Sequence, residues 1–203
     1  MPPKPKYTRE EIVKVAFDMT REMGFDAVTT RELGKRLGTS VSPIFTLFQN
    51  MHEVRVEVRK MAMKEFERYV ADSLNYSPAF KQFGIKMIEF AINEPKLFQI
   101  LYMEEQEESI TFGDMIHNLG EPAILCIGII RKDYDLTEEE AGILFGHVWL
   151  YTFSICVLVA NKVCCFAKEE ISRMLSMEFQ GELKLIKSGQ YREVTAEVTP
   201  KGE

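Results

Sequence analysis

Apolar residues recur every three or four positions through most of the chain, which is the spacing of one face of an α-helix. The first such segment lies between Thr8 and Gly24. The spacing Thr8-x-x-Glu11 forms a capping box, which satisfies backbone N–H groups at a helix start, and glycine commonly ends a helix. The apolar positions between them are Ile12, Val15, Ala16 and Met19. This pattern predicts a first helix from Thr8 to Gly24.

Two short helices with a tight turn between them are predicted next. The spacing Thr29-x-x-Glu32 repeats the capping box, and Gly38 ends that segment. A third helix starts near Ser40 or Ser42, with a proline in its first turn, where no backbone N–H is needed. This part of the chain therefore has the pattern of helix, turn and helix.

The remainder of the chain keeps the helical spacing, and no segment shows the alternation of a β-strand. The predicted segments cover residues 50–74, 77–94, 95–104, 111–132, 137–164 and 168–187. Gly120 and Pro122 should bend or break the helix over 111–132. After Gly189 the chain is polar, as expected of a frayed tail. The predicted fold class is all-α.

The run from Ile143 to Phe166 is apolar on two sides of its helix. Its length alone would allow a membrane span, but His147 and Lys162 interrupt it and no second such run is present, so no membrane contact is predicted. One face carries Phe145, Trp149, Cys156, Val159 and Val163, and the other carries Leu144, Val148, Tyr151, Ile155 and Leu158. A helix that is apolar on both faces has to be covered on both.

One of these faces can meet the chain's own core, and the other can meet a second copy of the chain. We therefore predict a homodimer in which the helices over 138–164 and 168–187 pair with their copies as a four-helix bundle. The residues assigned to the dimer interface are Phe145, Cys156, Val159, Val163, Ile171, Met174 and Leu175. The alternative is the central helix of a monomeric bundle.

Charge is unevenly distributed along the chain. The formal net charge is −6, yet residues 1–50 carry eight Lys or Arg against six Asp or Glu, which leaves +2 for the front and −8 for the remainder. The four cysteines lack C-x-x-C spacing, which indicates reduced thiols in a cytoplasmic protein. The three histidines are too far apart for a zinc motif, so we predict no metal or cofactor. A redox or soft-metal sensor at Cys164-Cys165 is the alternative role for those thiols.

The helix–turn–helix segment has the parts that a DNA-reading unit needs. Gly38 can adopt the left-handed conformation of a sharp turn. The anchoring side chains are Leu33, Leu37, Ile44, Leu47 and Phe48. The outward positions are Val41, Ser42, Pro43, Phe45 and Thr46, which could contact base edges, thymine methyl groups or phosphates in a major groove. The alternative is a purely structural helix pair.

Residues 8–54 resemble the DNA-binding domain of TetR-family transcriptional regulators. The shared features are a Thr-capped first helix, the pair Gly24-Phe25, a Thr-Thr start to the second helix, a Leu-Gly turn and an aromatic end to the third helix. The resemblance implies a three-helix DNA-binding domain over residues 1–50. It also implies a larger helical domain for ligand binding and dimerisation over residues 51–188, with a flexible tail over 189–203.

The resemblance also implies roles for individual residues. Thr29 and Thr30, with the free N–H groups of their helix, would bind a DNA phosphate, as helix N-termini do for anions. The implied DNA-binding residues are Lys6, Arg9, Thr29, Thr30, Arg31, Thr39, Ser40, Val41, Ser42, Phe45 and Thr46. Three positions depart from the family pattern: Phe45 replaces a tyrosine, Thr46 a histidine and Met51 a lysine. These departures should weaken phosphate contact and flatten the salt dependence of binding.

The middle of the chain is rich in aromatic and methionine side chains, which suit a pocket for varied apolar compounds. The resemblance implies a cavity there whose occupancy moves the helix that follows Asn50 and changes the spacing of two DNA-binding heads. The candidate effector-binding residues are Phe90, Phe98, Tyr102, Met103, Met115, His117, Trp149 and Phe153. Tyr102, His117 and Trp149 are the candidates for orienting polar groups, and core packing is the alternative role for each.

These observations favour a ligand-responsive transcriptional regulator that binds a palindromic operator in double-stranded DNA as a homodimer. The family's usual mode implies a repressor, released by a small apolar or aromatic effector. The sequence has no G-x-S-x-G, no phosphate-binding glycine loop and no H-E-x-x-H, so an enzyme is not predicted. The alternatives are a helical interaction protein with a weakened DNA-binding head and, with less support, a small-molecule-binding bundle enzyme.

Overall fold

The computed structural model describes residues 7–105, 110–117 and 119–192. Within these ranges the chain forms helices and turns without a β-strand, which confirms the all-α fold class. The helices are α1 (Arg9–Met23), α2 (Thr30–Leu37), α3 (Ser42–Leu47), α4 (Met51–Val70), α5 (Ala79–Asn93), α6 (Pro95–Tyr102), α7 (Phe112–His117), α8 (Glu121–Asp133), α9 (Glu138–Ala160) and α10 (Lys168–Lys187). Short 3₁₀ turns lie at Phe25–Ala27, Ala71–Asn75 and Gln190–Arg192. Lys6 and the residues after Arg192 lie outside the described residues.

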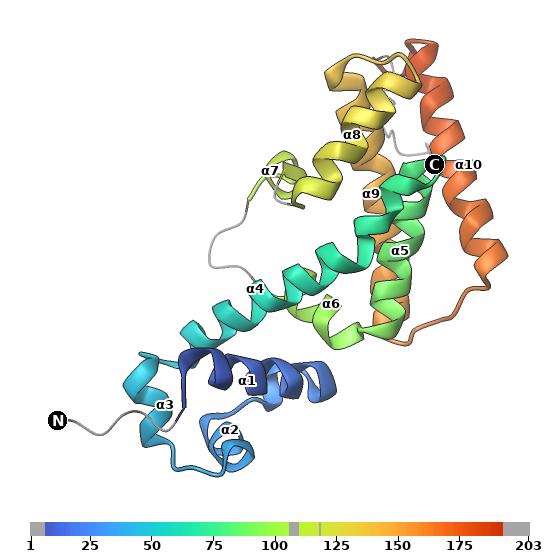
Figure 1. Ribbon diagram of the computed structural model, residues 1–203. Coiled ribbons are helices and arrows are strands. Elements are labelled where there is room, and N and C mark those ends of the chain that lie inside the picture. Colours follow the sequence, from blue (N-terminus) through green and yellow to red (C-terminus); the bar gives the residue numbers. More distant parts are fainter. Residues whose placement is uncertain (1–6, 106–109, 118, 193–203) are drawn as a thin grey trace, which may run out of the picture.

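Helices α1, α2 and α3 form a small head at one end of the molecule, and the predicted caps set their ends (Figure 1). The Thr8 hydroxyl accepts a hydrogen bond from the Glu11 N–H, and the Glu11 carboxylate accepts one from the Thr8 N–H. Thr29 caps α2 by accepting from the Glu32 N–H at 3.2 Å. Gly38 then ends α2 with a φ of 64°, in the left-handed conformation.

Helix α4 joins the head to the larger body of the protein (Figure 1). It packs against α1 in the head and against α5 and α6 in the body. One line of side chains at four-residue spacing is at most 1% exposed: Val54, Val58, Ala62, Phe66 and Val70. This line places α4 in a single core that is continuous between the two parts.

Helix α9 occupies the centre of the body, where it packs against α5, α8 and α10. The predicted capping box between Thr137 and Glu140 begins it. By length and composition α9 could cross a membrane, but 56% of its most apolar window is buried inside the fold. In this fold α9 is a core helix with one outward side.

Three element boundaries refine the sequence prediction. The predicted break in the segment 111–132 is confirmed, because α7 and α8 are separated at Gly120, whose φ is 89°. Helix α4 ends at Val70, before the 3₁₀ turn that precedes α5. Helix α9 ends at Ala160, so Cys164 and Cys165 lie exposed in the loop that leads to α10.

The predicted dimer interface needs a correction. Five of its side chains are at most 9% exposed in the single chain: Phe145, Cys156, Val159, Ile171 and Leu175. They form the chain's own core and cannot present a surface to a second copy. Of the other two, Met174 is half-buried on α10 and Val163 is 68% exposed in the loop before it. Helical spacing alone does not say which of two apolar faces meets the chain's own core.

The substitution Gly38→Ala should lower the free energy of unfolding by about 1 kcal/mol, because a non-glycine residue is strained in the left-handed conformation. The added Cβ makes no steric clash, because nothing lies within 4 Å of it, so backbone strain is the cause of the expected loss of stability. Gly128→Ala, in α8 and equally free of contacts, should instead stabilise by about 0.5–1 kcal/mol through helix propensity. Urea denaturation followed by circular dichroism measures both, and shifts of the same sign would contradict this assignment of the turn.

Candidate functional site

The turn between α2 and α3 folds back closely on α2. The Thr39 N–H donates to the Gly34 carbonyl at 2.9 Å, and a Cβ at Gly34 would lie 3.1 Å from the Thr39 carbonyl oxygen. A glycine at position 34 therefore permits the close approach. Beneath the turn Leu33 and Ile44 are fully buried, so α3 is held from behind, as the sequence predicts.

The outer face of α3 is exposed, and it carries the predicted groove-facing side chains together. Phe45 is 47% exposed and Val41, just before the helix, is 37% exposed. Ser42 and Thr46 are exposed between them, and the Thr46 hydroxyl donates to the Ser42 carbonyl at 3.1 Å. Two hydroxyls and two apolar groups thus form a continuous surface that can offer hydrogen bonds and methyl contacts to base edges.

The start of α2, which precedes this surface in the sequence, has groups that can bind an anion. Thr29 is exposed, and its hydroxyl oxygen is engaged as the helix cap, which leaves its O–H proton available to an acceptor. Thr30 is half-buried at the first position of the helix and Arg31 is exposed. Backbone N–H groups, a hydroxyl and a guanidinium at a helix N-terminus suit a phosphate. Thr39 is half-buried and Ser40 exposed in the following turn.

Arg9 has a different place from the one predicted. Its guanidinium donates to the Leu47 carbonyl at 2.8 Å and to the Glu53 carboxylate at 2.6 Å, and it lies 4.1 Å from the centre of the Phe48 ring. The Gln49 N–H and then Arg9 lower the pKa of Glu53 below its ordinary value by stabilising its charge. Arg9 therefore fixes the end of α3 to the start of α4 and is not free to follow a DNA backbone.

An aromatic cluster lies in the body, where α4, α6 and α9 meet. The Trp149 ring stacks on the Phe153 ring with centroids 5.1 Å apart. The Phe153 ring in turn lies 5.8 Å from Phe98 and 6.3 Å from Tyr102. Helix α4 contributes Phe66, whose ring lies 5.8 Å from that of Tyr102. Four of the predicted effector residues are therefore brought together, in what we call the aromatic cluster.

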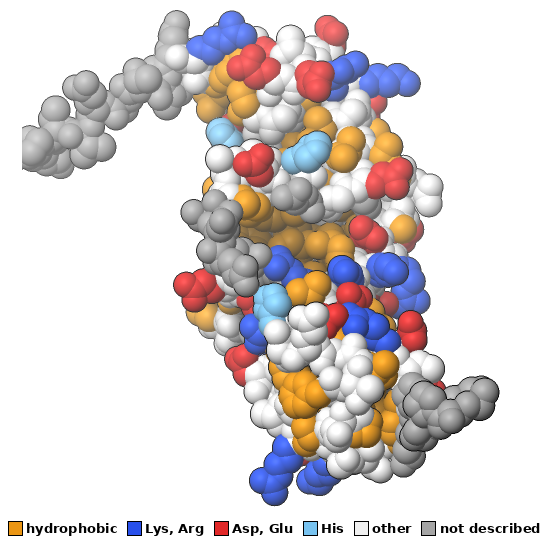
Figure 2. Space-filling model, turned by 90° about the vertical axis from the view of Figure 1, so that its left-hand side faces the viewer, with side chains coloured by type: hydrophobic (Ala, Val, Ile, Leu, Met, Phe, Trp, Pro, Cys, Tyr) orange, Lys and Arg blue, Asp and Glu red, His pale blue; other side chains and the backbone are white. Residues whose placement is uncertain are grey.

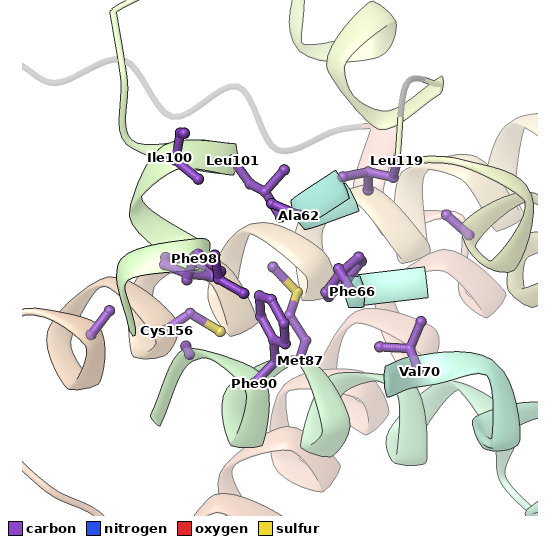
Figure 3. Packing of buried hydrophobic residues seen from close by; sticks show 14 of the residues in the cluster. Ala62, Phe66, Val70, Met87, Phe90, Phe98, Ile100, Leu101, Leu119 and Cys156 are labelled. Atoms are coloured by element: carbon purple, nitrogen blue, oxygen red, sulfur yellow. The ribbon is translucent and has the colours of Figure 1, made fainter. Parts of the chain in front are cut away.

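Figure 3 shows how the deeper wall of this region is built. The side chains of Phe66, Phe90 and Phe98 point toward the same interior, beside Met87 and Cys156. Phe66 was missed by the sequence analysis, although its four-residue spacing from the other buried positions of α4 is the signal that would have found it. Phe90 is fully buried, with its ring 5.3 Å from that of Phe66, and its role in binding an effector stays a prediction.

Two polar atoms are buried in the aromatic cluster without a hydrogen-bond partner among the described residues. They are the Tyr102 hydroxyl and the Trp149 indole N–H. Burial raises the pKa of Tyr102 far above its ordinary value, so the phenol is neutral. Buried polar groups in native proteins nearly always have partners, and an unpaired one costs free energy.

The other predicted effector residues lie elsewhere. His117 is exposed and Met115 half-buried on α7. Met103 lines a polar pocket of about 260 Å³ where the head meets the body, together with Lys96, Glu104 and Asn161. No ring contact joins His117 or Met103 to the aromatic cluster, although α7 approaches it through Phe112, whose ring centre lies 6.4 Å from that of Trp149.

Ion pairs connect the head with the body around this polar pocket. Arg21 of α1 is paired with Glu94, with Nε 2.7 Å from a carboxylate oxygen. Arg55 of α4 lies 3.1 Å from Asp26 and 3.6 Å from Glu104. Burial raises the pKa of Glu104, and Arg55 acts against that shift. Within the described residues, no group of three His, Cys, Asp or Glu side chains could hold a metal ion.

The outward sides of α9 and α10 form a second exposed surface, which we call the α9–α10 strip. It comprises His147, Leu150 and Ser154 of α9 and Met177, Gly181 and Leu185 of α10, at spacings of three or four residues. Leu150 is 50% exposed and Met177 is 68% exposed. His147 Nδ1 lies 3.3 Å from the Glu182 carboxylate, so the two outward sides adjoin.

Comparison with known protein families identifies one match. Residues 12–58 match the sequence model described as bacterial regulatory proteins, tetR family. The match begins in α1, includes the whole of α2, the turn and α3, and ends within α4. A search of the curated proteins found no match to the chain.

Arg9→Met should lower the free energy of unfolding by about 1 kcal/mol, because it removes hydrogen bonds to a carbonyl and a carboxylate while keeping the apolar stem. The matched change Lys14→Met breaks an exposed pair with Asp18 and should cost less than about 0.5 kcal/mol. Urea denaturation measures both, and hydrogen exchange of the α3 amides should accelerate only in Arg9→Met. An equal, small effect at both sites would show that Arg9 does not hold α3.

Proposed function

We propose that this chain is a DNA-binding transcriptional regulator of the TetR family and, more specifically, a ligand-responsive repressor. In this proposal a homodimer binds a palindromic operator and is released by a small, mostly apolar effector. The observation that carries the DNA-binding part is the exposed face of α3, which has hydroxyl and apolar groups outward and a rigid attachment behind. Because its target is DNA, we propose that it acts in the cytoplasm.

In the proposed complex, α3 contacts the bases of the DNA and α2 contacts its phosphates. Ser42 and Thr46 would hydrogen-bond to base edges, and Val41 and Phe45 would contact thymine methyl groups. The start of α2 and the exposed Arg31 would bind phosphates and set the register on the duplex. Phe45 lacks a hydroxyl that could reach a phosphate, which places more of the affinity on α2.

The proposed dimer follows from the size of the reading head. Helix α3 has six residues, which can contact too few base pairs to select one site. Two heads about 34–36 Å apart would read two half-sites on one face of the duplex. The α9–α10 strip supports this arrangement, because its exposed Leu150, Met177 and Leu185 would be covered by the same strip of a second copy.

The proposed effector site is the aromatic cluster, which is linked to the head by short covalent and hydrogen-bonded steps. Tyr102 directly follows Leu101, whose carbonyl accepts a hydrogen bond from Arg59 of α4 at 2.9 Å. A ligand that displaces the end of α6 would therefore shift α4, and with it the head. Such a ligand releases DNA only if it binds one arrangement of the heads better than the other.

The DNA-binding proposal predicts separable effects of two substitutions. Ser42→Ala should lower affinity for the operator by about 5- to 100-fold, the range of one lost base contact, and leave affinity for unrelated DNA unchanged. Arg31→Ala should weaken both about equally and reduce the slope of log affinity against log salt by about 1. Fluorescence anisotropy with DNA from upstream of the chain's own gene tests this, with Ser188→Ala as the control. Equal affinity of the unmodified protein for both DNAs at every salt concentration would contradict the proposal.

The dimer proposal predicts that charge on the α9–α10 strip dissociates the two copies. Leu150→Glu should give a monomer, because a carboxylate would be buried without a partner. Ile124→Glu is the matched control, since Ile124 is 52% exposed on α8, away from the strip. Light scattering at micromolar concentration distinguishes the states. A monomer for the unmodified chain, or dissociation by both changes alike, would be the contrary result.

A further inference from the structure

The aromatic cluster holds two polar atoms whose hydrogen-bonding needs are not met by the described residues around them. Trp149 is 2% exposed, and both its indole N–H and the Tyr102 hydroxyl are inaccessible to solvent. Their rings flank the same side chain, Phe153, at 5.1 Å and 6.3 Å between centroids. Two unpaired polar groups on rings that pack against one side chain indicate that hydrogen-bond partners are missing from this region.

The chemistry of the two groups restricts that partner. An indole N–H can only donate a hydrogen bond, so the partner has to carry an acceptor there. The phenol can donate as well, and because burial raises its pKa it carries no charge with which to attract a cation.

The walls of the cluster restrict the shape. Trp149 and Phe153 are nearly parallel, with 11° between their planes, and Phe98 is tilted by 37° from Phe153. The Trp149 and Phe153 rings already stack on each other, and a flat ligand ring can extend such a stack. The space-filling view shows a hollow lined with hydrophobic side chains midway along the molecule, on the face that carries α7 (Figure 2). The burial of Cys156 raises its pKa, which keeps the thiol protonated and unreactive toward a bound compound.

The geometry points to a specific class of effector: a neutral, flat, largely apolar compound with a carbonyl or ester oxygen that accepts hydrogen bonds from Trp149 Nε1–H and the Tyr102 hydroxyl. The inference rests on the proposed effector site and adds the ligand's chemistry to it. A charged compound is disfavoured because it would lose its hydration among the aromatic side chains that surround the two donors. A pure hydrocarbon would leave both donors unpaired.

Trp149 is the chain's single tryptophan, so its emission reports on this site in the unmodified protein. Three probes of similar shape separate the possibilities: methyl 2-naphthoate, which is neutral with an acceptor, 2-ethylnaphthalene, which has none, and the 2-naphthoate anion. The ester should quench Trp149 emission and bind about tenfold more tightly than the hydrocarbon, the factor expected for one net hydrogen bond, with the anion weakest. Equal binding of ester and hydrocarbon, or tightest binding of the anion, would overturn the inference.

A variant pair tests whether the Tyr102 hydroxyl is the donor. Tyr102→Phe should remove most of the preference for the ester and raise the Tm of the ligand-free protein, because it deletes a buried polar group without a partner. Tyr134→Phe is the control, since Tyr134 packs 5.1 Å from Phe179, outside the cluster, and should keep the full preference. A lower Tm for ligand-free Tyr102→Phe would show that the hydroxyl already has a partner, such as a bound water, and would overturn the inference.

The same titrations repeated with operator DNA keep this inference distinct from the proposed function. Preference for the ester together with release of DNA supports both. Preference for the ester without release supports the ligand class and contradicts the role of the cluster in controlling the head. Release without preference contradicts the ligand class alone.

Discussion

The burial of one continuous line of side chains along α4 is the constraint on which the rest of the structure depends. Val54 and Val58 bury against the head, and Phe66 and Val70 bury within the body, with each at most 1% exposed. Because these side chains are close-packed at both ends, α4 cannot rotate or slide in the body without moving its contacts in the head. The head is therefore positioned by the body's interior, and a change in that interior can reach the DNA-reading surface.

Polar contacts at the junction act in the same direction. Arg55 of α4 pairs with Asp26 in the head and Glu104 in the body, and Arg59 of α4 is hydrogen-bonded to the end of α6. Exposed ion pairs contribute little stability each. Their role here is to fix relative positions. Each contact joins two elements that must move relative to one another when the head shifts. The buried side chains hold α4 rigidly in the core, and the polar contacts fix the position of its ends.

Much of the fold could be predicted because its signals are local. Thr8, Thr137 and Gly38 fix helix ends through chemistry within four residues, and all three act in the structure as the sequence predicted. The proposed dimer surface could not be assigned in this way, because α9 is apolar around most of its circumference and only packing shows which side faces the core. Arg9 could not be assigned either: its carboxylate partner Glu53 is 44 residues away in the sequence. Similarly, Tyr102 and Trp149 were identified by residue type, but only the fold shows that the polar atoms of both are buried without a partner among the described residues.

The account is tested most directly by the distance between the two heads. Spin labels at Gln49→Cys, with the exposed Cys164 and Cys165 replaced by serine, report this distance by pulsed electron resonance in the proposed full-length dimer. With operator bound, we expect one narrow distribution, consistent with recognition helices about 34–36 Å apart. A compound that quenches Trp149 should shift or broaden that distribution as it releases the DNA. An unchanged distribution, with Trp149 fully quenched, would contradict the claim that α4 couples the aromatic cluster to the head.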